Sequence, residues 1–200
     1  MINISEYSPF FIKRSFNLPK YKLIKKQKIK PKCDYLFYEI YHKINNVDIT
    51  SFKQYNEIQE KTNIAETVNT FKIKNKEYIL NNLLYEPIIN LITLNAICKY
   101  YKINLIYLQD KIYIKMFYSE SDLSPLIINN EYKFLLSIDT NNYYEITNLE
   151  KPLNSVSYYK LNELIEYAIK LDLPYTKIKK IDLYNSIYNY LVNLNIFKID

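Results

Sequence analysis

The pattern of apolar and polar positions is clearest between residues 87 and 118. Apolar residues recur at the spacing of a helix face over residues 88–97, and Pro87 suits the first turn because its missing N–H has no partner there. Residues 103–108 are too continuously apolar for a half-exposed strand, which predicts a central strand. After a short turn, residues 112–117 alternate as a second strand does. A helix packed against a small sheet is therefore expected at the centre of the fold.

The segments on either side of this unit extend the pattern. Three further helices are predicted before it, over residues 33–44, 50–68 and 74–85. Two further strands are predicted after it, over residues 132–138 and 143–147, with residues 119–130 as a loop. Helices that precede strands along the chain are typical of the α+β class. We therefore expect an α+β domain in which helices are followed by a small antiparallel sheet.

Charge is distributed unevenly along the chain. The net charge is +6, and residues 20–32 contain seven lysines and no acidic residue. Such a segment is either a solvated arm or edge strand, where lysines oppose aggregation, or a contact for an anionic polymer. Residues 150–157 read as a linker, and two helices joined by a proline-containing loop follow, over residues 160–171 and 180–194. The predicted organisation is a basic arm (1–32), an α+β core (33–149) and a helical hairpin (150–200).

Composition excludes several chemistries. The 200 residues include no glycine, 23 tyrosines and one histidine, and the abundance of Lys, Asn, Ile and Tyr indicates an AT-rich genome. Without glycine, neither a P-loop nor a dinucleotide-binding fingerprint can form, because both need close backbone approach to phosphate. Turns that need a positive φ must use Asn or Asp, and Asn pairs occur where turns are expected, at residues 45–46, 81–82, 129–130 and 141–142.

Cys33 and Cys98 each lie in an apolar helical pattern, and we interpret them as isolated buried thiols of a reducing, intracellular compartment. Two cysteines and one histidine do not supply an ordinary zinc site, so no metal or other cofactor is expected. The first ten residues lack the charged start and apolar run of a signal peptide. No stretch of about 18 apolar residues occurs, so no membrane partner is expected. The sequence gives no basis for an oligomeric state.

Residues 32–37 read Lys-Cys-Asp-Tyr-Leu-Phe, and residues 94–108 form a helix–strand unit. In this order they resemble the papain-like fold of OTU-type deubiquitinases, especially the diverged versions of large DNA viruses. The family motif Asp-Gly-x-Cys-Leu-Phe starts the helix of the nucleophilic cysteine, and alignment on Leu-Phe places Tyr35 at that position and Lys32 at that of the acid. The family's late Asn-His-Tyr corresponds to residues 141–145, where Tyr143 stands and no histidine occurs. The resemblance spans residues 31–147 and implies an inactivated enzyme.

No substitute catalytic group is evident. Cys33 and His42 are nine residues apart on one predicted helix, on opposite sides and about 13 Å apart along its axis. The carboxylate pairs Glu57/Glu60 and Asp110/Glu120 lack apolar shielding or a third partner, so no acid–base pair is expected. A cysteine hydrolase with a rearranged site, pairing Cys98 with His42, is the one enzymatic alternative.

The tail resembles a SAP motif, a DNA-binding unit of helix, extended loop and helix. The matching positions are Leu161, Glu163, Leu164, Ala168, Leu171, Leu173, Pro174, Thr176, Lys179, Lys180, Leu183 and Ile187. The glycine of the family's loop is absent, and the loop is about one residue longer. Three lysines just before and at the start of the second helix lie where backbone N–H groups favour phosphate: Lys177, Lys179 and Lys180. The alternative is a hairpin that docks on the main domain or on a partner protein.

Five tyrosines of the tail either stack on nucleic-acid bases or pack within the fold: Tyr158, Tyr159, Tyr184, Tyr188 and Tyr190. The function expected from the sequence is a non-catalytic, nucleic-acid-associated protein of a large DNA virus that binds DNA without strong sequence preference. The expected contacts are Lys177, Lys179 and Lys180 in the tail and Lys22, Lys25, Lys26 and Lys28 in the arm. The alternative is a structural or protein-binding module, for instance a virion component that contacts viral structural proteins, built on an inactivated cysteine-protease fold. The expected location is the host cytoplasm or the virion.

Overall fold

The computed structural model describes residues 34–46, 54–120, 124–194 and 196. All of them belong to one compact unit, residues 31–200. The basic arm with Lys22, Lys25, Lys26 and Lys28, the thiol of Cys33 and the start of the helix expected at residue 50 lie outside the described residues.

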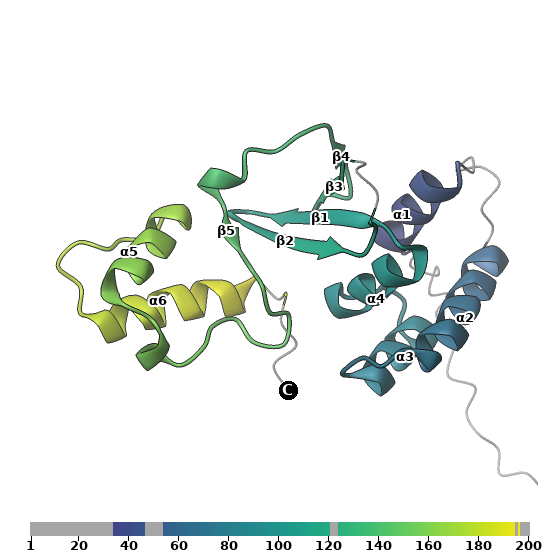
Figure 1. Ribbon diagram of the computed structural model, residues 1–200, viewed down its shortest axis with the longest axis horizontal. Helices are drawn as coiled ribbons and strands as arrows, with labels where there is room; N and C mark the ends of the chain where they lie inside the picture. Colours follow the sequence, from purple (N-terminus) through teal and green to yellow (C-terminus); the bar gives the residue numbers. More distant parts are fainter. Residues whose placement is uncertain (1–33, 47–53, 121–123, 195, 197–200) are drawn as a thin grey trace, which may run out of the picture. The chain divides into compact units, whose positions relative to one another are not determined.

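Four helices precede the strands (Figure 1): α1 (Tyr35–Asn45), α2 (Gln54–Thr70), α3 (Lys76–Tyr85) and α4 (Leu91–Tyr101). The strands are β1 (Asn104–Gln109), β2 (Ile112–Phe117), β3 (Leu126–Asn129), β4 (Phe134–Leu135) and β5 (Tyr144–Glu145). Short 3₁₀ turns η3 (Thr140–Asn142) and η4 (Val156–Tyr158) lead to the final helices α5 (Leu161–Lys170) and α6 (Lys180–Asn193). The predicted α+β class, with helices before a small sheet, is confirmed.

The prediction that the sheet is antiparallel is wrong for two of its pairings. The strand order is β4-β3-β1-β2-β5. β1 pairs antiparallel with β2, and β3 with β4, but β3 lies parallel to β1 and β5 parallel to β2. The reason is β3, which occupies residues 126–129 inside the segment expected to be a loop. After β2 the chain crosses to the far side of β1, and the sheet becomes mixed.

The start of α4 also differs from the prediction. The helix begins at Leu91 and not at Pro87, because Asn90 is its N-cap and its side chain accepts a hydrogen bond from the Thr93 N–H at 2.9 Å. Asn82 of α3 holds the segment before it, donating to the Ile88 carbonyl at 3.1 Å and accepting from the Asn90 N–H at 2.9 Å. These side-chain bonds take the place of the helical turn that the apolar spacing predicts.

Seven described residues, none of them glycine, adopt a left-handed backbone in the turns. Positive φ occurs at Asn46, Asn75, Lys102, Asp110, Tyr132, Asp172 and Lys177. The asparagines and aspartates among them confirm the prediction that Asn or Asp takes the place of glycine, but Lys102, Tyr132 and Lys177 contradict it, and residues 81–82 lie inside α3. Lys102, the C-cap of α4, has a φ of 52° and donates its N–H to the Cys98 and Lys99 carbonyls. A left-handed conformation costs a residue with a Cβ about 1–2 kcal/mol, so each such lysine or tyrosine is held by its surroundings.

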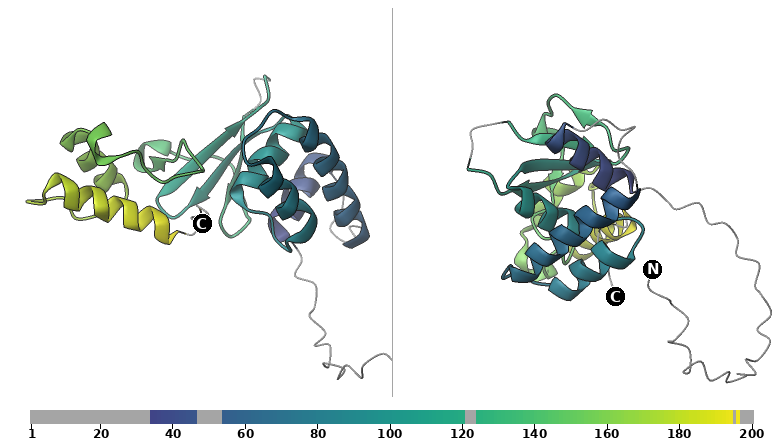
Figure 2. Two further views of the ribbon diagram at one scale, coloured as in Figure 1. Left: turned by 90° about the horizontal axis from the view of Figure 1, so that it is seen from below. Right: turned by 90° about the vertical axis from the view of Figure 1, so that its right-hand side faces the viewer.

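One face of the sheet supports the main core. α4 packs against β2, where the Cys98 sulfur lies 3.9 Å from that of Met116, and α2 and α3 lie beside α4 (Figure 2). The hairpin belongs to the same core, because its buried side chains join this cluster: Leu164, Ala168, Leu171, Leu183, Ile187 and Leu191. The opposite face carries a smaller cluster of Ile106, Leu108, Tyr113 and Ile127, against which Ile138 and Tyr143 pack. No helix among the described residues is long and apolar enough to cross a membrane.

Candidate nucleic-acid interface and a groove beside the sheet

The predicted lysines of the tail gather at the start of α6. Lys179 is its N-cap and offers no side-chain oxygen to the first turn, and Lys177 has a φ of 58°. Lys177 and Lys179 are exposed and Lys180 is half-buried. None of the three forms an ion pair with another described residue. Asp182 in the first turn of α6 is the nearest acid in the sequence and partly offsets their charge.

Local contacts fix the loop that presents these lysines. The Asp172 backbone is left-handed (φ 55°), and its carboxylate lies 2.7 Å from the Lys111 ammonium of the β1–β2 turn. The hydrogen-bonded Asp172 carboxylate raises the pKa of Lys111. At the other end of the hairpin, the Glu163 carboxylate accepts the Lys160 N–H at 2.6 Å. The loop therefore makes its turns with Asp172 and Lys177, without the glycine of the SAP pattern.

The tyrosines of the tail pack against one another and against β5. Tyr167 meets Tyr144 and Tyr159 edge-to-face, with ring centroids 4.9 and 5.9 Å apart, and Tyr184 stacks on Tyr188 at 6.2 Å. The Tyr184 hydroxyl donates to a backbone carbonyl at 2.7 Å. Burial raises the pKa of Tyr167 and of Tyr184. These rings hold the hairpin to the sheet. Tyr158, with 70% of its surface exposed, is the ring most open to a ligand.

The net positive charge of the chain lies outside the hairpin, in residues 1–32. Residues 1–32 contain nine basic residues and one acidic residue, a net charge of +8. The remaining residues contain 18 basic and 20 acidic residues, a net charge of −2. The lysines at the start of α6 are thus a local cluster on a slightly acidic unit, and the arm holds the whole excess of the chain.

The two positions that the OTU pattern marks as degenerate do not meet in a common hollow. Tyr35 is the first residue of α1, with 61% of its surface exposed. Tyr143 is half-buried and lines a hollow of about 400 Å³ together with residues of β1, the β1–β2 turn and residues 135–142. No residue of α1 lines that hollow.

The alternative pairing of Cys98 with His42 is not assembled either. Cys98 is fully buried beside Met116, and burial raises the pKa of its thiol to about 12, so the thiolate is scarce at neutral pH. His42 lies half-buried on α1, where its ring centroid is 6.5 Å from that of Tyr38. Among the described residues, no three His, Cys, Asp or Glu side chains gather as a metal site would need.

A buried ion pair that sequence reasoning missed joins three helices. Asp34, with no exposed surface, accepts the Phe37 N–H at 3.1 Å as the N-cap of α1. Its second oxygen accepts the Lys61 ammonium of α2 at 2.7 Å and the Ile89 N–H ahead of α4 at 2.9 Å. Glu57 lies 2.9 Å from Lys61. An acid just before an apolar helix is an N-cap signal, but nothing in the sequence indicates its distant partners. Because both Asp34 oxygens are engaged in contacts that join the helices, we interpret the cluster as structural.

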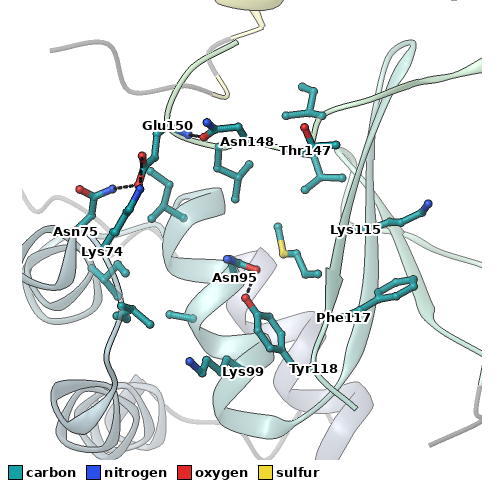
Figure 3. A pocket seen from close by; sticks show the side chains of 18 residues that line it. Lys74, Asn75, Asn95, Lys99, Lys115, Phe117, Tyr118, Thr147, Asn148 and Glu150 are labelled. Carbon is teal, nitrogen blue, oxygen red and sulfur yellow. Dashed lines mark hydrogen bonds and ion pairs between the residues drawn. The ribbon is translucent and has the colours of Figure 1, made fainter. Parts of the chain in front are cut away.

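A groove of about 720 Å³ lies between α4, β2 and residues 146–150 (Figure 3). Its floor is apolar, made by Ile79, Ile92, Ala96, Ile114, Met116 and Ile146. Its rim is polar, made by Lys74, Asn75, Asn95, Lys99, Tyr118 and Glu150. The exposed lining of the groove is more polar than apolar, so polar groups contribute at least as much of its surface as the apolar floor does.

The rim is held by short contacts. The Tyr118 hydroxyl donates to the Asn95 side chain at 2.9 Å, and burial raises the pKa of Tyr118. Glu150 accepts the Asn75 amide at 3.2 Å and lies 3.7 Å from the Lys74 ammonium. The Lys99 ammonium lies over the Phe71 ring, 5.0 Å from its centroid. Lys99 forms no ion pair with another described residue.

No protein-family model, curated protein or solved structure compared with the chain gives a match. The OTU-like and SAP-like patterns therefore remain resemblances of the sequence.

Proposed function

We propose that the chain is a non-catalytic, nucleic-acid-associated protein that binds DNA without strong sequence preference. The observation that carries the proposal is the charge asymmetry, +8 within the first 32 residues and −2 over the rest. Segments of this kind contact phosphates, which give affinity but no sequence information. Three lysines at the start of α6, the exposed Lys177 and Lys179 and the half-buried Lys180, supply a second phosphate contact, supported by the SAP-like pattern around them. An origin in a large DNA virus is part of the proposal and is supported by the AT-rich composition.

The test is binding of fluorescein-labelled duplex DNA to the full chain, followed by anisotropy at several salt concentrations. Each phosphate contact adds about 0.9 to the slope of log affinity against log salt. Replacing Lys177, Lys179 and Lys180 by Gln should lower that slope by about 3. Replacing Lys22, Lys25, Lys26 and Lys28 by Gln should lower it by about 4. The matched control replaces Lys72, Lys151 and Lys160, three exposed lysines that form no described ion pair, and should leave the slope unchanged.

Two duplexes of unrelated sequence should bind with affinities within about threefold, because phosphate contacts dominate. Absence of binding at low salt would refute the proposal. An equal loss in the control variant would show that only net charge matters and would remove the hairpin from the interface.

A structural or protein-binding module is the second candidate function. The observation that favours it is the groove beside β2, which has an apolar floor, a polar rim and no described occupant.

A further inference from the structure

The outer edge of β2 is covered along only about a third of its length. β5 pairs with the first two residues of β2, where the Tyr144 N–H donates to Lys111 and the Ile146 N–H donates to Tyr113, each at 2.9 Å. Beyond that point the chain leaves β2 and forms the far wall of the groove (Figure 3). In the part of the chain that the structure describes, no strand pairs with residues 114–117 on this side.

Because the backbone of a strand alternates, N–H and C=O groups of β2 point outward along this open edge. Because the carbonyls of Lys111 and Tyr113 face β5, the period of two places the N–H and C=O groups of Lys115 and Phe117 on the same side. Among the described residues these four groups have no backbone partner. An edge with unpaired donors and acceptors is a template for a further strand.

The groove lies directly beside the open edge and suits the side chains of an added strand. Alternate residues of such a strand point to opposite faces of the sheet. On one face they would meet the apolar floor next to Met116, and on the other they would lie beside Lys115 and Phe117. Figure 3 shows these last two side chains projecting away from α4. Half of the Phe117 surface is exposed, which leaves an apolar contact for the second face.

The charged groups around the groove indicate which kind of added strand would bind beside β2. Of the lysines around the groove, Lys115 is paired with Glu145 at 3.1 Å and Lys74 lies near Glu150, so Lys99 is the cation without a carboxylate among the described residues. If the basic arm (residues 1–32, net charge +8) were itself the added strand, it would add cations next to the unpaired Lys99.

We propose that the open edge of β2 binds an extended peptide of a partner protein, which adds as a strand beside Lys115 and Phe117. Its apolar side chains fill the groove, and an acidic residue lies beside Lys99. The inference rests on the second candidate function and gives that function its site and its class of partner. It uses none of the lysines assigned to DNA.

Amide hydrogen exchange of the full chain tests the open edge. The amides of Ile114 and Met116 bond to β1, so they should exchange at least about tenfold more slowly than those of Lys115 and Phe117. Equal protection of all four in the monomer would overturn the proposal, because the chain itself would then cover the edge. Protection that rises with protein concentration would also overturn it, and would assign the edge to a second copy.

The probe for binding is a fluorescein-labelled octapeptide that alternates valine and threonine, with one groove-facing valine replaced by glutamate so that it can reach Lys99. Its binding is measured by anisotropy against the same peptide with lysine at that position. The glutamate peptide should bind at least about tenfold more tightly and should slow exchange at Lys115 and Phe117. Lys99→Gln should weaken its binding about threefold, and Lys72→Gln, at an exposed lysine outside the groove, should not.

Phe117→Pro removes an edge N–H without touching the bonds to β1, and should abolish binding of the glutamate peptide. Phe117→Ala keeps that N–H and should retain most of the binding, which separates backbone pairing from loss of the ring. Equal binding of the two peptides, or unchanged binding by Phe117→Pro, would overturn the proposal. The variant that lacks the α6 lysines should bind the peptide as the unmodified chain does, so failure of the DNA proposal and failure of this one are distinguishable.

Discussion

Removal of the buried Asp34 carboxylate should be among the most damaging single changes to the fold. Asp34→Ala takes away the N-cap of α1, the acceptor of the Ile89 N–H and the partner of the Lys61 ammonium in one step. Lys61 stays buried, with 6% of its side chain exposed, and keeps only Glu57 at 2.9 Å. The perturbation therefore leaves an underpaired charge and an unsatisfied N–H at the junction of three helices.

The size of the effect follows from these contacts. Truncating one partner of a buried ion pair costs about 3–5 kcal/mol, and Glu57 moves the expected value toward the lower end. Loss of the N-cap adds about 1 kcal/mol, and the orphaned Ile89 N–H costs about 1–3 kcal/mol, but both overlap with the first term. We expect a loss of about 4 kcal/mol, a large share of the roughly 5–15 kcal/mol that stabilises a domain.

Urea unfolding followed by circular dichroism measures this loss. The double variant Asp34→Ala, Lys61→Met should recover about 1 kcal/mol, because the methionine needs no counter-ion while the partly exposed Glu57 loses its lysine partner. Asp182→Ala, at an acid in the first turn of α6, is the matched control and should cost less than about 1 kcal/mol. A loss below about 1 kcal/mol for Asp34→Ala, or no recovery in the double variant, would refute the assignment of a buried, fully engaged pair.

Two further predictions concern α4. Lys102→Gly should raise the free energy of unfolding by about 0.5–1 kcal/mol, because glycine adopts the C-cap's positive φ without a Cβ clash, whereas Lys99→Gly inside the helix should lower it by about 1 kcal/mol. Both changes are read from urea midpoints, and a destabilised Lys102→Gly would contradict the φ. Burial raises the pKa of Cys98 from 9.0 to about 12, so in a Cys33→Ser background iodoacetamide at pH 8 should label Cys98 only after unfolding. Since the unfolded thiol ionises first, stability should also fall as the pH rises from 9 to 12. Rapid labelling of the native protein would contradict this burial.

Long periodic segments were predictable from the sequence, and short or non-local contacts were not. The helices α1, α5 and α6 and the strands β1 and β2 lie where apolar spacing places them, because each buries a continuous face. β3 has only four residues, and three adjacent apolar residues do not distinguish a strand from a loop. The strands expected at 132–138 and 143–147 are only two residues long each in the structure. Because β3 was not predicted, the crossing of the chain from β2 to the far side of β1 and the parallel pairings of the sheet were not predicted either.

The candidate sites also divide into one that the sequence predicts and contacts that it does not. The lysines at the start of α6 were predictable because they are adjacent in sequence and precede an apolar helix. The open edge of β2 was not, because it depends on where β5 stops pairing, and β5 is too short to be located from its sequence. The Asp34–Lys61 pair bridges 27 residues, and no spacing rule connects an N-cap to a lysine in the middle of another helix.

DNA binding by the lysines would be driven by charge, whereas peptide binding at β2 would be driven by backbone hydrogen bonds and apolar burial. A chain that binds both DNA and a partner protein can therefore be tested by changing the salt concentration. The described unit lies within a region of net charge −2, so it gives DNA little long-range attraction beyond the three lysines of α6. The net charge of +8 in residues 1–32 attracts a polyanion whatever its sequence. A peptide on β2 would be held mainly by backbone hydrogen bonds and apolar burial, which salt screens weakly. If one chain joins a partner protein to DNA, raising the salt concentration should release the DNA while the glutamate peptide stays bound. Release of both together would show that charge alone drives both contacts, and would leave the edge of β2 without a role.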